Sequence, residues 1–356
     1  MKHVRVATYE IKTGTFQEIA DKAQDGMLRT FRDQPERTEA NLDEIEKKAS
    51  DNPCKDLNQL VERVRRGYYP FLSPDIQLIP REPNYVGSAT SPVHSGPWDY
   101  LTHVPLVAYG PGHLVPGEYT DEATMADLAP TTAELIGYQG WPKRDGRVLG
   151  EALDPQATDP PKLVVSMVWD GGGWNVLNRW PDAWPFLKSR MAKGTNVLDA
   201  IVGSSPSVTP AVHANIGTGA FPDQHGVVDI WLRRGDVTED SWEGIDPRNL
   251  VIPTLADMYD KALDNEPKIA MVGAEPWHLG MIGRGAAMQG GDKDIAVMEG
   301  DDGELITNPE FYSLPDYLDD VPGVEEDISA VVMSRDGGEG WASLARTTTQ
   351  AGWGPW

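Results

Sequence analysis

Two short segments carry residue types that catalysis or metal binding requires. In the first, residues 168–173 (VWDGGG), Asp170 directly follows an apolar run and precedes three glycines. Ligands of open α/β sheets bind at the carboxyl ends of strands, so Asp170 lies where a catalytic acid or a metal ligand is expected. The glycines would let the backbone approach a ligand closely. A turn with an aspartate cap explains the same residues about equally well.

The second segment, residues 204–219, crowds small hydroxyl side chains into a turn bounded by prolines, and a helical pattern with His213 follows. A hydroxyl at such a helix start lies near free backbone N–H groups, which favour an anionic substrate. The simpler alternative is that these Ser and Thr residues are ordinary helix N-caps.

Together the two segments resemble the alkaline phosphatase superfamily, and most closely its nucleotide pyrophosphatase/phosphodiesterase branch. The resemblance rests on the Asp-Gly-Gly sequence after an apolar strand and on four features of the second segment: Thr209-Pro210, His213 four residues after Thr209, the pair Thr218-Gly219, and residues 221–227 (FPDQHGV).

This resemblance implies roles for individual residues. In the family pattern, the nucleophilic hydroxyl lies ten residues before the glycine of a Thr-Gly pair, which is Thr209 in this chain. Thr209 would therefore be the catalytic nucleophile and also a metal ligand, and Asp170 would be a metal ligand. Ser207 is the alternative nucleophile.

An earlier stretch, residues 91–112, resembles the carboxy-terminal part of the same superfamily, where a metal-binding histidine precedes a strand and a Gly-Pro-Gly turn. Residues 127–149 continue this likeness. The metal-binding role falls on His94, whereas His103 is interpreted as structural. The core thus resembles a circularly permuted phosphatase, in which the usual last segment precedes the usual first one.

Part of the family pattern is missing from the printed sequence. No Asp-His pair occurs in it, and no histidine follows His278, so the second metal-ligand group and the Asp-His-Gly motif are not found. His225 and Asp229 have ligand-like spacing, but their surroundings match the turn after the nucleophile, and we interpret them as structural. The resemblance therefore predicts a truncated core, and inactivity of this truncated chain on its own is one of the expected outcomes.

The implied function is a metal-dependent hydrolase of phosphate esters, similar to phosphodiesterases and nucleotide pyrophosphatases. Two divalent ions, zinc by resemblance, would hold the attacking and leaving oxygens, with Asp170, Thr209 and His94 among their ligands. A small phosphorylated molecule would be the substrate. The alternative is a non-catalytic, truncated phosphatase-like domain that binds a ligand or a partner. A sulfatase is disfavoured, because that pattern needs Cys or Ser in place of Thr209.

The elements that must position these residues indicate an α/β fold, with a doubly wound, mostly parallel sheet covered by helices. Residues 104–109 and 163–169 are near-continuous apolar runs, as interior parallel strands should be. Helical patterns at residues 124–136, 184–193 and 253–262 alternate with them. We expect both strands to lie inside the sheet.

Four regions follow from composition and resemblance. Residues 1–35 read as a strand and a helix that resemble the start of a ferredoxin-like antibiotic biosynthesis monooxygenase domain, which leaves monooxygenase activity as the weakest alternative. We expect deletion of residues 3–35 to change the melting temperature little. Residues 36–67 read as a charged helical connector, and their charge pattern indicates a solvated connector or surface helix. Residues 68–156 are the permuted carboxy-terminal part of the core, and residues 157–356 carry the nucleophile and an acidic tail.

Composition excludes several classes of protein. The chain has 31 Lys and Arg against 55 Asp and Glu, a net charge of −24, which disfavours nucleic-acid binding and docking on anionic membranes. Its single cysteine, Cys54, rules out an internal disulfide or a multi-cysteine metal site. No apolar stretch resembles a membrane span or a signal peptide, so a cytoplasmic location is the default expectation.

Overall fold

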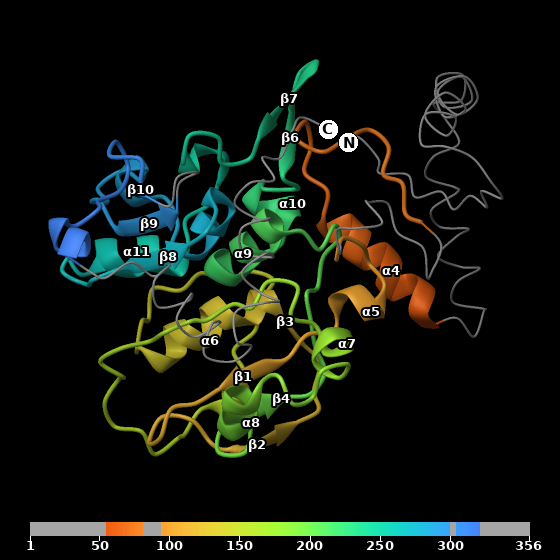
Figure 1. Ribbon diagram of the computed structural model, residues 1–356, viewed down its shortest axis with the longest axis vertical. Helices are drawn as coiled ribbons and strands as arrows, with labels where there is room; N and C mark the ends of the chain where they lie inside the picture. The colour runs from red at the N-terminus through yellow and green to blue at the C-terminus, as the bar shows by residue number, and fades with distance from the viewer. Residues whose placement is uncertain (1–54, 81–93, 300–303, 321–356) are drawn as a thin grey trace, which may run out of the picture.

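The computed structural model describes residues 55–80, 94–299 and 304–320 (Figure 1). The segment 1–35, with its predicted strand and helix, lies outside these residues. The α-helices are α4 (Lys55–Arg66), α5 (Asp99–Thr102), α6 (Leu128–Leu135), α7 (Trp174–Leu177), α8 (Pro185–Met191), α9 (Thr209–Thr218), α10 (Pro222–His225) and α11 (Leu255–Ala262). The strands are β1 (Leu106–Ala108), β2 (Gly117–Tyr119), β3 (Ala123–Thr124), β4 (Thr195–Val197), β5 (Ala200–Ile201), β6 (Trp231–Arg234), β7 (Val237–Asp240), β8 (Ala270–Gly273), β9 (Ile295–Glu299) and β10 (Leu305–Ile306).

The strands of the described residues form four small sheets. One has the order β1-β4-β2, with β1 antiparallel and β2 parallel to β4. A second has the order β10-β9-β8, with β8 parallel and β10 antiparallel to β9. The pairs β3-β5 (parallel) and β6-β7 (antiparallel) complete the set. Because β1 and β2 come from region 68–156 and β4 from region 157–356, the two predicted halves of the core share one sheet.

The predicted α/β class is confirmed as a mixed α/β fold, but the described strands form several small sheets and not one doubly wound parallel sheet. Residues 163–169 form no strand, and their apolar side chains face solvent, with Leu163 76% exposed. β1 does form, but at the edge of its sheet and antiparallel to β4. Both expectations of an interior parallel strand are therefore wrong. An apolar run becomes a strand only when neighbours satisfy its backbone groups and cover its side chains, and here β4 rather than 163–169 pairs with β1.

The predicted helices are confirmed, with shorter bounds. Residues 124–136 become the 3₁₀ helix η2 (Met125–Asp127) followed by α6, and 184–193 and 253–262 become α8 and α11. A capping box starts α11, because Thr254 and Asp257 exchange hydrogen bonds between side chain and backbone. Among the described residues, no helix is long and apolar enough to cross a membrane.

Helix α9 occupies the centre of the molecule (Figure 1). Ala214 belongs to a hydrophobic cluster around Trp242, whereas Ile216 belongs to a second cluster formed with β3, β4 and β5. The 3₁₀ helix η5 (Pro276–Met281) lies directly against α9, because a Cβ added to Gly217 would meet the Gly280 carbonyl oxygen at 2.0 Å. Only glycine permits so close an approach. Because α9 is buried between these two hydrophobic clusters, its position is fixed, and so is the position of its first residue, Thr209.

The described end of the predicted connector, helix α4, is not a solvated helix. Its Arg63 is buried and donates hydrogen bonds to the Pro97 carbonyl and to the Asp99 carboxylate, both at 2.6 Å. Arg66 donates to the Gly203 carbonyl at 3.1 Å. The charge pattern suggested exposure because it could not show these acceptors. Helix α4 instead ties the segment before α5 to the loop before α9.

A buried histidine makes stability depend on pH. His225 is fully buried; its ring lies 2.9 Å from the Asn215 side-chain amide, and Nδ1 accepts from the Val227 N–H at 3.2 Å. Burial lowers the pKa of His225 from 6.5 to about 3. The neutral ring therefore contributes stability that is complete above pH 6.5 and is lost as pH falls toward 3, by up to about 1.4 kcal/mol per pH unit.

We expect His225→Gln to flatten this dependence. Buried carboxyls act with the opposite sign in the same range, since burial raises the pKa of Asp229 to about 6. The measurement is therefore the difference in unfolding free energy between the native chain and His225→Gln, taken at each pH from 7 to 4. That difference should shrink as the pH falls. A difference that is constant with pH would contradict the lowered pKa.

Candidate active site

Three residues singled out in the sequence lie together in the structure. One carboxylate oxygen of Asp170 lies 3.0 Å from His94 Nε2, and the other accepts a hydrogen bond from the Thr209 hydroxyl at 2.8 Å. Thr209 and His94 are 39 and 76 positions from Asp170 in the sequence, respectively. The permuted order requires this proximity, and their roles in catalysis and metal binding remain predictions.

Helix α9 positions Thr209, which is its first residue. The preceding Val208 is extended, and Pro210 follows without an N–H group, as is common in a first helical turn. The free N–H groups and the dipole of this turn favour negative charge next to the Thr209 hydroxyl. Because α9 is held between two hydrophobic clusters, this helix start has a rigid support.

A tight turn positions Asp170. Gly171 adopts a positive φ of 67°, and the Gly172 N–H donates to the Trp169 carbonyl at 2.9 Å. A side chain is strained in this backbone conformation, so glycine suits the position after Asp170. A Cβ there would lie 4.0 Å from the His94 ring. The turn thus brings the carboxylate next to the histidine.

The loop that contains His94 is held by Ser207. His94 Nδ1 lies 2.7 Å from the Ser207 carbonyl oxygen, which can only accept, so Nδ1 carries a proton and Nε2 faces Asp170. The Ser207 hydroxyl accepts from the Gly96 N–H at 3.1 Å and donates to the His94 carbonyl. Ser207 is 2% exposed. A hydroxyl that is buried and bonded in this way is unsuited to attack a substrate, which argues against Ser207 as the alternative nucleophile.

Replacement of Ser207 by alanine tests this positioning role. The change leaves the Gly96 N–H without its acceptor, so we expect a destabilisation of about 1–3 kcal/mol and, because His94 loses its support, about tenfold or more weaker zinc binding. Thermal unfolding and zinc titration calorimetry measure both. Ser189→Ala is a matched control, since this half-buried hydroxyl donates to the Phe186 carbonyl and accepts from Arg190 Nε, both within its own helix. Lost activity with unchanged zinc affinity would favour a catalytic Ser207 instead.

The contact between Asp170 and His94 favours the ionised form of the Asp170 carboxylate. The hydrogen bond from His94 is the main reason that the pKa of Asp170 lies far below its usual range, and the Thr209 hydroxyl acts in the same direction. The same hydrogen bond raises the pKa of His94. Asp170 thus presents two anionic oxygens to a histidine nitrogen and a hydroxyl.

Two further histidines lie near this group and were not predicted as site residues. His213 and His278 pack edge to face with ring centroids 4.7 Å apart, and the charge of Asp170 acts on both rings. Burial lowers the pKa of His213 to about 4, and its Nδ1 has no hydrogen-bond partner among the described residues. The four-residue spacing from Thr209 could have signalled His213. Nothing local signals His278, which reaches the site only because η5 lies against α9.

The remaining histidine predictions concern structural roles, and the contacts agree with them. His103 Nε2 lies 2.9 Å from the Leu198 carbonyl, and its ring packs near Trp174. His225 is buried in the core, as described above. Asp229 accepts a hydrogen bond from the Ile230 N–H at 2.7 Å.

The donor set fits a zinc-type ion. A carboxylate, a hydroxyl and an imidazole whose other nitrogen bonds a carbonyl form the oxygen–nitrogen combination that zinc accepts. The Nδ1 of His213, which has no hydrogen-bond partner among the described residues, is a further nitrogen donor close enough for the charges of Asp170 and His94 to act on its ring. Asp170, His94 and Thr209 are the residues that would hold the ion.

Comparison with known proteins identifies the segment that carries most of this site. Residues 164–332 match the family described as Type I phosphodiesterase / nucleotide pyrophosphatase. This phosphodiesterase-like segment contains Asp170, Thr209, His213 and His278, whereas His94 lies outside it.

A more distant relative is also found. The chain is 27% identical over 187 residues to "Alkaline phosphatase PhoV" of Synechococcus elongatus, a match that covers 47% of this chain and 33% of PhoV. The match therefore spans about a third of the length of that relative. No solved structure matches the chain.

Proposed function

We propose that this site hydrolyses phosphate esters, with Thr209 as the nucleophile and with Asp170 and His94 as ligands of a divalent cation. The observation that carries the proposal is the Asp170 carboxylate shared between the Thr209 hydroxyl and His94 Nε2, at 2.8 and 3.0 Å. The match of residues 164–332 to the phosphodiesterase family supports the same chemistry.

Asp170, Thr209 and the start of α9 have separate roles in the proposed reaction. Asp170 accepts the Thr209 hydrogen bond and so fixes the direction of the hydroxyl, while the start of α9 favours the phosphate anion. Thr209 Oγ1 attacks phosphorus and gives up its proton, the bond to the leaving alcohol oxygen breaks, and the phosphoryl group becomes esterified to Thr209. With a diester this adduct keeps the second ester group. Water then attacks the phosphorus, the bond to Oγ1 breaks and Thr209 regains a proton from that water, so that a monoester leaves when the substrate is a diester and phosphate leaves when it is a monoester. A bound divalent cation, zinc by family resemblance, would lower the pKa of this hydroxyl and offset the phosphoryl charge.

The substrate class is a small phosphate ester. The matching family is described by phosphodiesterase activity, whereas the relative is named an alkaline phosphatase. The net charge of −24 argues against large polyanions as substrates. Diesters and monoesters are therefore compared directly in the test.

The test incubates the full chain with bis(4-nitrophenyl) phosphate and, separately, with 4-nitrophenyl phosphate, with zinc and after metal removal. Because Asp170, Thr209 and His94 are few ligands for a two-ion clamp, we expect slow release of nitrophenolate that requires zinc. Mass spectrometry of the quenched protein should find the added group on Thr209. Zinc-independent release would contradict the proposal. No release and no adduct, with retained zinc binding, would favour the non-catalytic binding domain.

A further inference from the structure

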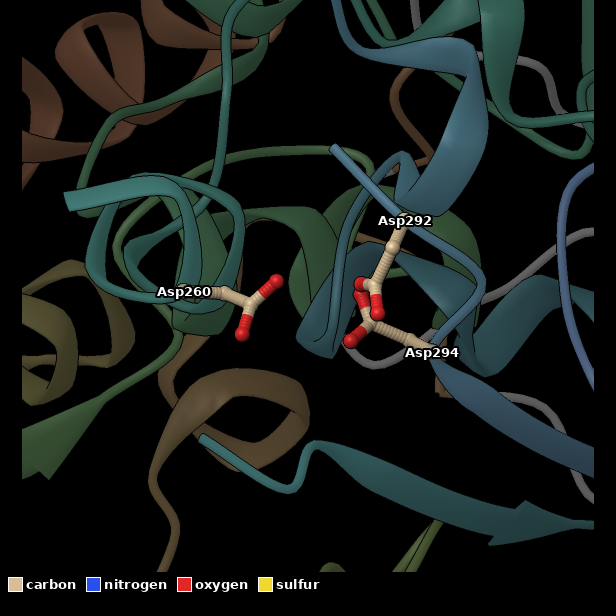
Figure 2. A group of neighbouring side chains, drawn as sticks. All are labelled: Asp260, Asp292 and Asp294. Carbon is tan, nitrogen blue, oxygen red and sulfur yellow. The ribbon is translucent and has the colours of Figure 1, made fainter. Parts of the chain in front are cut away.

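Three carboxylates gather at a second place, toward the end of α11 opposite its capping box. Carboxylate oxygens of Asp260, Asp292 and Asp294 lie within 4.8 Å of one another. Asp260 belongs to the last turn of α11, and the other two precede β9. Figure 2 shows the Asp260 carboxylate opposite the pair formed by Asp292 and Asp294. None of these residues belongs to the site around Thr209.

An unsatisfied buried atom distinguishes this cluster from a solvated acidic surface. Asp260 is 3% exposed, and its Oδ1 has no hydrogen-bond partner in the described part of the chain. Asp257, one turn earlier on the same helix, accepts from the Thr254 N–H at 2.8 Å and from the Arg284 N–H at 2.6 Å. Burial on α11 therefore does not by itself leave a carboxylate unpaired. An unpaired buried carboxylate costs free energy unless something compensates it.

The charge around the cluster is poorly balanced. Lys268 attracts Asp260, but the amino groups of Lys261 and Lys293 donate to the carbonyls of Gln289 and Pro309. Asp294 is only 7% exposed, and burial together with the neighbouring carboxylates raises its pKa to about 8. The same causes raise the pKa of Asp260 to about 6. Without a bound cation, the ionised cluster is unfavourable.

We propose that Asp260, Asp292 and Asp294 bind a hard divalent cation, with Ca²⁺ favoured over Mg²⁺. All donors are carboxylate oxygens, which suit Ca²⁺ or Mg²⁺ and not the nitrogen and sulfur preference of zinc. Ca²⁺ takes six to eight oxygens in flexible geometry, whereas Mg²⁺ retains several waters and usually only one or two carboxylates. Asp292 is exposed, so the ion has a path from solvent and room for water ligands.

The bound ion would join the end of α11 to the start of β9 and so would stabilise the fold. The competing explanation is a proton shared between Asp260 and Asp292, since two carboxylates in contact can hydrogen-bond when one of them is protonated. The two explanations differ in their response to calcium and to replacement of Asp292 by its amide.

The experiment measures thermal unfolding of the full chain, stripped of metal with a chelator, at pH 8 with CaCl₂, MgCl₂ or neither. At calcium about 100-fold above its Kd, the melting temperature should rise by about 5 °C or more, and by less with magnesium. Titration calorimetry should show one calcium per chain. Asp292→Asn, an isosteric change of the exposed member, should abolish both effects. Asp236→Asn, an exposed aspartate in the β6-β7 turn, is the matched control and should keep them.

Asp170→Asn separates this site from the one around Thr209, because it should leave the calcium response intact whether or not the chain hydrolyses phosphate esters. The proposal is overturned if calcium shifts nothing in the native chain, or if Asp292→Asn responds as the native chain does. If calcium shifts nothing in the native chain and Asp292→Asn raises the melting temperature, the shared proton explains the cluster instead.

Discussion

Thr209→Ala should reduce the slow, zinc-dependent release of nitrophenolate by about 10³-fold or more. The physical reason is that no other hydroxyl shares a hydrogen bond with Asp170 among the described residues. Ser207, two residues away, is buried and bonded to the loop of His94. The measurement is the initial rate with each nitrophenyl ester at saturating zinc.

Thr209→Ser is the matched control for this prediction. Serine keeps the hydroxyl and can donate the same hydrogen bond to Asp170. We therefore expect Thr209→Ser to retain activity within about tenfold of the native chain. It should also form the covalent adduct, now on the serine. Equal rates for Thr209→Ala and the native chain would overturn the assignment of the nucleophile while leaving a metal site possible.

Asp170→Asn should produce the largest loss of zinc affinity, about 100-fold or more, together with loss of hydrolysis. Asp170 contacts both His94 and Thr209, so its replacement by a neutral amide removes the anionic charge that both partners share. Titration calorimetry measures zinc binding without dependence on turnover. His94→Gln should weaken zinc binding by a smaller factor, because Asp170 and Thr209 remain.

Asp182→Asn provides the control for a general effect of lost negative charge. Asp182 is exposed and precedes α8 in the same region of the chain. Its replacement should leave both zinc affinity and hydrolysis unchanged. If it weakened zinc binding as strongly as Asp170→Asn, the ion would be attracted by the net charge of −24 rather than held by the residues around Thr209.

The elements that sequence reasoning located best are those whose signals are local. Helix α11 begins at a capping box that can be recognised from Thr254 and Asp257, and helix α9 begins at a proline-bounded turn. The sheet was predicted less well. An apolar run such as 163–169 reveals a preference for burial, but pairing depends on which distant strands are available, and β1 pairs with β4.

The sequence by itself determined the candidate residues in two ways. Asp170 and the hydroxyl-rich turn that contains Thr209 stand in local patterns, whereas the choice of Thr209 as nucleophile and of His94 as metal ligand came from the resemblance to the alkaline phosphatase superfamily. Only the tertiary structure decided what surrounds them. Packing of η5 against α9 brings His278 to His213, and Ser207 turns inward to hold the His94 loop. Likewise, α11 and the segment before β9 meet to form the aspartate cluster. Contacts between segments far apart in the chain depend on close packing of whole elements, which no local pattern encodes.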